Sequence, residues 1–202
     1  MKSGTMRLLI GTVLLFCAIA CGGGDETGTT PTSPTPTSPT ATPITFSVRA
    51  EGTINNWTEW GGGATTLAKN GQAFFSKTGG AGGARGFTVA TANATTGDVL
   101  SAGTNFDTWQ YANQKDALVR YLDSIANGTL VLVGVADDAG FQSTSGTAAV
   151  IAALEKRGCT RIREYGFRDS YAVIFIAGET TPKAEAFSTT ASVSIQYAVT
   201  PR

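Results

Sequence analysis

Charged residues beside apolar segments are the first candidates for chemistry in this chain. Asp137 and Asp138 follow residues 129–135, a continuous apolar segment that predicts a strand buried on both faces. Paired carboxylates at a strand end could act in acid–base catalysis or bind Ca²⁺. The same pair would suit a turn or the cap of a following helix, so it does not define a function by itself.

A second charged pair, Arg168-Asp169, precedes the apolar segment at residues 171–177. An unpaired guanidinium at the mouth of a buried strand would be costly, so we expect Arg168 to have a fixed partner. Asp137 and Asp169 are the candidates for that partner. The pattern fits a ligand-binding arginine and a structural ion pair equally well.

The composition limits the chemistry that is available. The chain has 202 residues and no histidine, which excludes Ser-His-Asp and Cys-His catalysis and removes imidazole as a metal ligand. Lys and Arg together number 15, as do Asp and Glu. Because there is no excess of positive charge, we expect no nucleic-acid partner.

The N-terminal residues predict export and anchoring. Two basic residues precede an apolar run at residues 8–16, which is too short to span a bilayer and is followed by small residues directly before Cys21. This pattern resembles the lipobox of bacterial lipoproteins. We therefore expect residues 1–20 to be a lipoprotein signal peptide and Cys21 to carry the lipid that tethers the protein to the membrane. The alternative is an ordinary secretory signal with an incidental cysteine.

The segment behind the cysteine predicts a stalk. Residues 21–43 are rich in Gly and then in Thr, Pro and Ser, a composition typical of an extended spacer. In lipoproteins, an Asp directly after the lipidated cysteine is expected for retention in the inner membrane. This chain has Gly22 at that position, which favours the outer membrane or the cell surface. Residues 44–202 would then form one domain. Its single cysteine, Cys159, predicts a buried structural thiol and no internal disulfide.

Apolar patterning in this domain predicts an α+β fold. Strands are expected around residues 44–48, 74–75, 87–91, 99–100, 129–135, 171–177 and 192–199. One helix is expected to be capped by Asn113 and followed by Gly128, with Leu118 and Leu122 on its buried face. A second helix is expected at about residues 145–157. Two helices against many short strands indicate the α+β class.

Glycine and tryptophan mark the remaining features. The glycine-rich residues 79–86 lack phosphate-loop spacing and precede a strand, so they predict a tight backbone crossing. Trp57 and Trp60 lie in a Gly-flanked loop, and Trp109 follows a polar segment. Aromatic residues in such loops suit stacking on sugar rings or on a partner protein. For Trp109, burial in the core is the favoured alternative.

Several segments, taken in order, resemble one family. They are Arg85-Gly86-Phe87-Thr88-Val89, Thr96-Gly97-Asp98-Val99, Phe106-Asp107-Thr108, Asn127-Gly128-Thr129, Asp137-Asp138 and Gly166-Phe167-Arg168-Asp169. By this order and spacing, residues 72–178 resemble the ILEI/PANDER domain, also called the GG domain. That domain occurs in interleukin-like EMT inducer, in pancreatic-derived factor and in the stem domain of protein O-mannose N-acetylglucosaminyltransferase.

The resemblance implies two antiparallel β-sheets with short helices packed against them. It also implies a non-catalytic module. We expect no cofactor and no metal. Secreted members act as signalling proteins, whereas the glycosyltransferase stem holds a sugar with an Arg-Asp-Arg set. The matching residues here are Arg85, Asp137 and Arg168. The disulfide cysteines of the secreted animal members are absent.

The sequence thus predicts a membrane-tethered, non-enzymatic binding module, lectin-like, whose partner is a glycan or glycoprotein. One alternative is a protein-interaction, adhesion or signalling domain that uses the loop of Trp57 and Trp60. Another is a glycoside hydrolase built on the carboxylates of Asp137, Asp138 and Asp169.

Overall fold

The structure is a computed structural model that describes residues 41–52, 63–78, 85–143 and 145–202. The chain divides into two units, residues 1–38 and 39–202, and the second unit contains every described residue. The predicted signal peptide and Cys21 lie outside the described residues, as do Trp57, Trp60 and most of the glycine-rich segment.

Nine strands, two α-helices and one short 3₁₀ helix make up the described part of the chain. In chain order they are β1 (Ile44–Gly52), β2 (Ala64–Lys69), β3 (Gln72–Thr78), β4 (Gly86–Asn93), β5 (Val99–Phe106), α2 (Ala112–Ser124), β6 (Thr129–Asp137), α3 (Thr147–Glu155), η1 (Arg161–Glu164), β7 (Ser170–Ile176), β8 (Ala184–Ser188) and β9 (Val193–Val199).

All nine strands belong to one hydrogen-bonded network. Strand β6 lies between β4 and β7, and β5 and β8 extend this group at its two edges. Strand β1 lies between β2 and β9, and β3 pairs with β2. The two groups join where the ends of β1 and β6 run parallel, through the pairs Glu51↔Ala136 and Gly52↔Asp137. The end of β6 is therefore the junction of the whole network.

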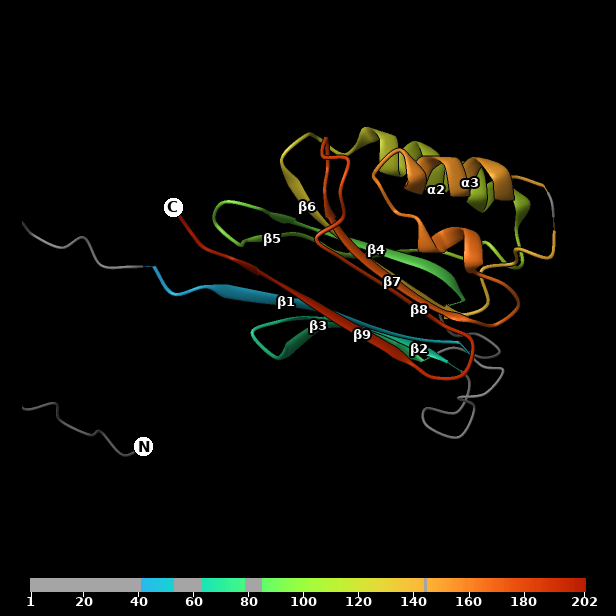
Figure 1. Ribbon diagram of the computed structural model, residues 1–202, viewed down its shortest axis with the longest axis horizontal. Coiled ribbons are helices and arrows are strands. Elements are labelled where there is room, and N and C mark those ends of the chain that lie inside the picture. The colour runs from blue at the N-terminus through green and yellow to red at the C-terminus, as the bar shows by residue number, and fades with distance from the viewer. Residues whose placement is uncertain (1–40, 53–62, 79–84, 144) are drawn as a thin grey trace, which may run out of the picture. The chain divides into compact units, whose positions relative to one another are not determined.

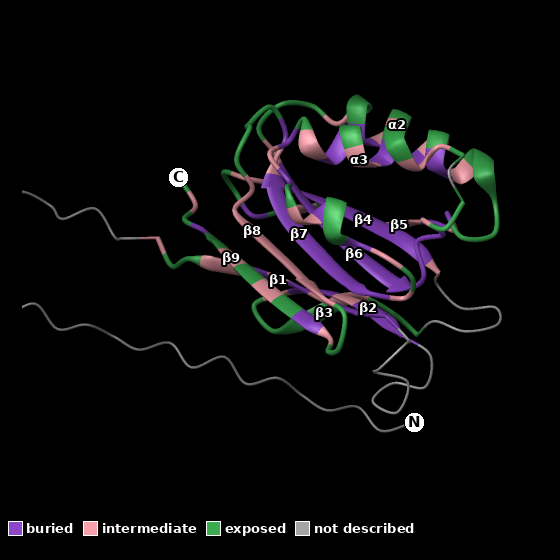
Figure 2. Ribbon diagram, turned by 45° about the vertical axis from the view of Figure 1, so that its right-hand side comes forward, coloured by how far each residue is buried: buried purple, intermediate pink, exposed green. Residues whose placement is uncertain are grey.

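Two apolar cores hold the network together. The helices α2 and α3 lie over one face of the β4–β6–β7 group (Figure 1), where Leu118 and Leu154 are buried with Tyr171. On the opposite face, Leu132 of β6 belongs to the same buried cluster as Phe46 of β1. Figure 2 shows the consequence: the central strands are buried, while exposed residues lie on the outer surfaces of the helices. Burial on both faces explains the continuous apolar sequences of β6 and β7.

The structure confirms the α+β class and corrects some details. Both predicted helices and all predicted strands are present, whereas β2 and β8 were not predicted. The division into two antiparallel sheets is not confirmed, because one network joins all strands and its junction is parallel. The prediction that Asn113 caps α2 is wrong, because Tyr111 holds the N-cap position. Gly128 does not end that helix either, because it lies in the turn that leads to β6.

No helix within the described ranges is long and apolar enough to cross a membrane.

Candidate functional site

Strand pairing brings distant candidate residues to one end of the network. Asp137 ends β6 and pairs with Gly52 of β1. On the other side of β6, Gly86 of β4 pairs with Ala136, so Arg85 comes next in register beside Asp137. Because the pairing register fixes which residues are neighbours across a sheet, the fold itself places Arg85 and Asp137 on adjoining strand ends.

Arg168 reaches the same end from the segment before β7. Its Nε atom lies 3.6 Å from Oδ1 of Asp137, and the two side chains are 36% and 9% exposed. This ion pair is longer than a direct hydrogen bond, and Nε of Arg168 has no hydrogen-bond partner in the described part of the chain. Asp137 is thus the observed partner of Arg168. The other predicted partner, Asp169, instead accepts a hydrogen bond from the amide of Gly166 at 2.8 Å.

The backbone around this pair is unusual. Asp137 and Arg168 both have a φ of 58°, in the left-handed region that non-glycine residues seldom adopt. Two glycines allow the chain to pack closely against them. A Cβ on Gly52 would lie 1.9 Å from the carbonyl oxygen of Arg168, and a Cβ on Gly63 would lie 2.6 Å from the amide nitrogen of Asp137. Such local strain is often found at binding sites.

Arg85 is held by a separate turn that the sequence analysis did not assign to the site. Its Nη2 donates to Oδ2 of Asp107 at 2.8 Å and also to the side-chain oxygen of Gln110. The amide side chain of Asn105 donates to the carbonyl oxygen of Arg85 at 3.2 Å and so fixes its backbone. As in Arg168, Nε of Arg85 is buried without a hydrogen-bond partner in the described residues. The missed signal was Phe106-Asp107-Thr108, a segment noted only for its resemblance.

Each arginine lies against an exposed aromatic ring. The guanidinium of Arg85 lies 4.4 Å from the ring centre of Trp109, and that of Arg168 lies 5.1 Å from the ring centre of Phe167. Trp109 is 47% exposed and Phe167 is 48% exposed. The alternative of core burial for Trp109 is therefore wrong. Phe167 is an additional exposed aromatic residue, which was not predicted to stack on a ligand.

Two further carboxylates at this end have raised pKa values. Burial raises the pKa of Asp138, although its Oδ1 accepts a hydrogen bond from the amide of Gly140 at 2.6 Å. Burial also raises the pKa of Asp169. Within the described residues, no group of three or more Asp, Glu, Cys or His side chains could hold a metal ion. Asp138 therefore serves here as an acceptor that closes the turn after β6.

The predicted structural thiol is confirmed as buried. Cys159 is fully buried, and this burial raises the pKa of its thiol to about 12. A thiol with so high a pKa stays protonated and is a poor nucleophile.

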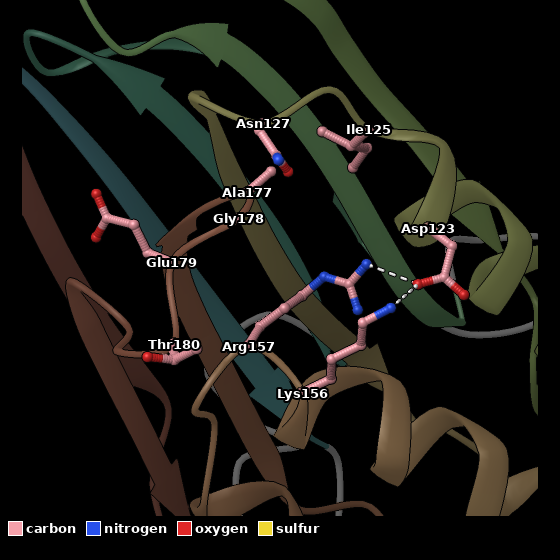
Figure 3. Close-up of a pocket in the computed structure, with 9 residues that line it drawn as sticks. All are labelled: Asp123, Ile125, Asn127, Lys156, Arg157, Ala177, Gly178, Glu179 and Thr180. Carbon is pink, nitrogen blue, oxygen red and sulfur yellow. Dashed lines mark hydrogen bonds and ion pairs between the residues drawn. The ribbon is translucent and has the colours of Figure 1, made fainter.

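A cavity of about 280 Å³ lies at the opposite end of β6 and β7 (Figure 3). Residues at the C-terminal ends of α2 and α3 and in the turn from β7 to β8 line this cavity. There Arg157 is only 9% exposed and donates to Oδ1 of Asp123 at 3.1 Å and to the carbonyl oxygen of Ala153. The hydrogen bond from Arg157 lowers the pKa of Asp123. Arg85, Asp137 and Arg168 do not line this cavity.

The fold and the strand-end site define a mixed α+β domain that presents two arginines, each paired with a carboxylate and each beside an exposed aromatic ring, an arrangement suited to binding. Residues 85–179, from the start of β4 to just beyond β7, match the family model of interleukin-like EMT inducer. The chain is 36% identical over 95 residues to protein FAM3C of Homo sapiens and 35% identical over 95 residues to protein FAM3C of Rattus norvegicus.

These matches support the assignment of an ILEI/PANDER domain to the segment that carries Arg85, Asp137 and Arg168. Each relative is matched over 47% of this chain, and the chain spans 38% of the length of the curated relatives it matches. The name of the matched family describes interleukin-like proteins.

Proposed function

We propose that this protein is a carbohydrate-binding module whose site is formed by Arg85, Asp137 and Arg168. The observation that carries the proposal is the ion pair of Arg168 and Asp137 at 3.6 Å, next to the start of β4, which Arg85 directly precedes. Nε of Arg168 has no hydrogen-bond partner in the described residues, so it can donate to a ligand hydroxyl or to a bridging water. Hydrogen bonds to charged groups are the stronger ones, so a small polar site can hold a sugar.

The charges at the site favour a neutral sugar. Arg85 is paired with Asp107, and Arg168 is paired with Asp137. Two guanidinium groups are thus balanced by two carboxylates, and the pairs supply no excess positive charge to attract an acidic sugar. We therefore expect neutral hydroxyl groups, and not a carboxylate, to be the groups that the site recognises.

The aromatic residues beside the arginines supply apolar contact area. Trp109 and Phe167 are each about half exposed and each lies against one arginine. An aromatic ring can stack on the apolar face of a pyranose. The site thus combines polar groups for sugar hydroxyls with rings for the sugar face.

The path of β1 suits the predicted tether. This strand begins at Ile44, next to the predicted stalk, and ends at Gly52, which pairs with Asp137. Nine residues of strand span roughly 30 Å at about 3.3 Å per residue. The proposed sugar site thus lies at the end of β1 opposite to Ile44.

The second candidate is a protein-interaction or signalling domain. Tyr111 is 51% exposed and follows Trp109 in the same turn. Exposed aromatic residues and arginine are typical of protein interfaces, and the matched family has a cytokine-like name. In this case the same arginines would contact a protein surface.

A glycan array that holds neutral and acidic oligosaccharides, probed with the full chain, tests the proposal. We expect selective binding to neutral glycans that Asp137→Asn abolishes, with no release of reducing sugar on prolonged incubation. Binding to no glycan on the array would contradict carbohydrate recognition. Steady release of reducing sugar that Asp137→Asn abolishes would make the protein a glycoside hydrolase.

A further inference from the structure

Lys115 is a buried lysine outside the proposed sugar site. It lies at the N-terminal end of α2, and only 1% of the residue is exposed. Its ammonium donates to the carbonyl oxygen of Gly140 at 2.8 Å, to the carbonyl oxygen of Ser143 at 3.1 Å and to Oγ1 of Thr147 at 2.9 Å. These three acceptors match the three N–H donors of an ammonium group, so the side chain is held in one geometry.

The position is unfavourable for a cation. Burial lowers the pKa of Lys115, and the nearby carboxylate of Asp138 only opposes this effect. The N-terminal end of a helix also carries partial positive charge. A buried lysine here is therefore best explained by what its hydrogen bonds hold. Two of the acceptors, Gly140 and Ser143, lie in the connection from β6 to α3, and the third, Thr147, is the first residue of α3.

One side of this connection packs against the turn that holds Arg85. A Cβ on Gly140 would lie 2.7 Å from Cα of Trp109, so the connection and the turn are in close backbone contact. The same turn carries Asp107 and Gln110, the two residues that bond the Arg85 side chain. A displacement of Gly140 would therefore be transmitted to the partners of Arg85.

The other side packs against the segment that presents Arg168. The amide of Ala139 donates to the hydroxyl oxygen of Tyr165 at 3.1 Å. The ring of Phe141 packs on the ring of Tyr165 at a centroid distance of 5.2 Å. Tyr165 directly precedes the Gly166-Phe167-Arg168-Asp169 segment. The connection thus contacts the supports of both arginines and begins directly after Asp137.

We propose that Lys115 is a positioning residue, which holds the connection from β6 to α3 between the Arg85 turn and the Arg168 segment and so fixes the spacing of the two arginines. The proposal rests on the proposed function only for what this spacing serves, because the contacts themselves do not depend on the ligand. Lys115 touches neither arginine in this arrangement and acts through Gly140.

Amide hydrogen exchange of the full chain tests the proposal without a ligand. We compare wild type, Lys115→Met and the control Lys156→Met, which removes a lysine that is 74% exposed. All are measured well below their melting temperatures. In Lys115→Met we expect exchange in residues 107–110 and 138–143 to rise by about tenfold or more, with little change in β7 and in residues 151–155 of α3. Lys156→Met should leave both segments unchanged.

A second variant keeps the test valid if Lys115→Met does not fold. Thr147→Val preserves the shape of the side chain but removes one acceptor of Lys115 and the hydrogen bond that the Thr147 hydroxyl donates to the carbonyl oxygen of Ser143. Because Lys115 keeps its two carbonyl acceptors, the rise in residues 107–110 should be smaller than in Lys115→Met. A uniform rise across the domain, or no rise in these segments, would overturn the proposal. Failure of wild type to bind any glycan would instead contradict the proposed function and would leave this exchange result intact.

Discussion

Two arginine-containing regions lie at opposite ends of β6 and β7, and they differ in how fully their hydrogen bonds are made. At the cavity end (Figure 3), Arg157 is 9% exposed and donates directly to Asp123 at 3.1 Å and to the carbonyl oxygen of Ala153. At the strand-end site, Arg168 is 36% exposed and lies 3.6 Å from Asp137. Arg157 is thus bonded to protein acceptors, whereas Nε of Arg168 has no hydrogen-bond partner in the described residues.

In our proposal, the cavity and the binding site are different places on the domain. The cavity has a volume of about 280 Å³, but the guanidinium of Arg157 that lines it already donates to protein acceptors. The strand-end site combines left-handed backbone at Asp137 and Arg168 with exposed aromatic residues beside each arginine. Strain and incomplete hydrogen bonding are the features that functional sites tend to share.

The largest effect is expected from Gly52→Ala, which tests whether the strand-end site depends on close backbone packing. A Cβ there would lie 1.9 Å from the carbonyl oxygen of Arg168, so we expect a loss of about 3 kcal/mol in the free energy of unfolding. Gly71→Ala is the control, because its Cβ would meet nothing within 4 Å and only its positive φ costs about 1 kcal/mol. Urea unfolding measures both, and equal losses would contradict the packing argument.

Arg157→Ala tests the structural role assigned to the cavity end. The change removes a buried charged hydrogen bond and the packing of the guanidinium on Phe175, so we expect a loss of about 2 kcal/mol. Arg168→Ala, at a more exposed and longer ion pair, should cost less than about 1 kcal/mol. If Arg168→Ala destabilised the domain more than Arg157→Ala, the two assignments would have to be exchanged.

The smallest effect is expected for the contribution of Asp138 to the pH dependence of stability. Burial raises the pKa of this carboxyl group. A raised folded-state pKa means that the contribution of Asp138 to stability is present below its ordinary pKa and is lost as the pH rises through the folded-state value. Asp138→Asn removes this loss and retains an oxygen for the amide of Gly140. We therefore expect the variant to be as stable as wild type or more stable at pH 7, by up to about 1 kcal/mol.

Urea unfolding of wild type and Asp138→Asn at pH 7 and at acidic pH checks this sign. The advantage of the variant should shrink as the pH falls toward the ordinary aspartate pKa. A variant that is clearly less stable at pH 7 would show that the ionised carboxylate stabilises the turn after β6.

Most strands and both helices could be predicted from the sequence, because the formation of these elements depends on the apolar pattern of neighbouring residues. The continuous apolar segments of β6 and β7 reflect burial on both faces, and the alternation at residues 192–199 reflects the half-exposed β9. By contrast, β2 has the sequence Ala-Thr-Thr-Leu-Ala-Lys, which has little apolar alternation and gave no signal. The N-cap of α2 was also missed because Tyr111 makes no side-chain capping bond.

The candidate site could be predicted only in part. The family resemblance selected Arg85, Asp137 and Arg168, and the apolar strand beside Arg168 indicated that it needs a partner. The parallel pair Gly52↔Asp137 could not be predicted, because it joins strands that are far apart in the sequence. The positive φ of Arg168 could not be predicted from the sequence either, because arginine seldom adopts it.

The most direct test of the central claim is a calorimetric titration of the full chain with the strongest neutral glycan from the array. Arg168→Ala should weaken binding by at least about 1.5 kcal/mol, and Arg168→Lys should weaken it as well, because a point charge cannot reproduce the planar guanidinium. The control Arg161→Ala removes a surface arginine paired with Glu164 and should leave the affinity unchanged. Wild-type affinity in a folded Arg168→Ala variant would contradict the assignment of Arg168 to the sugar site.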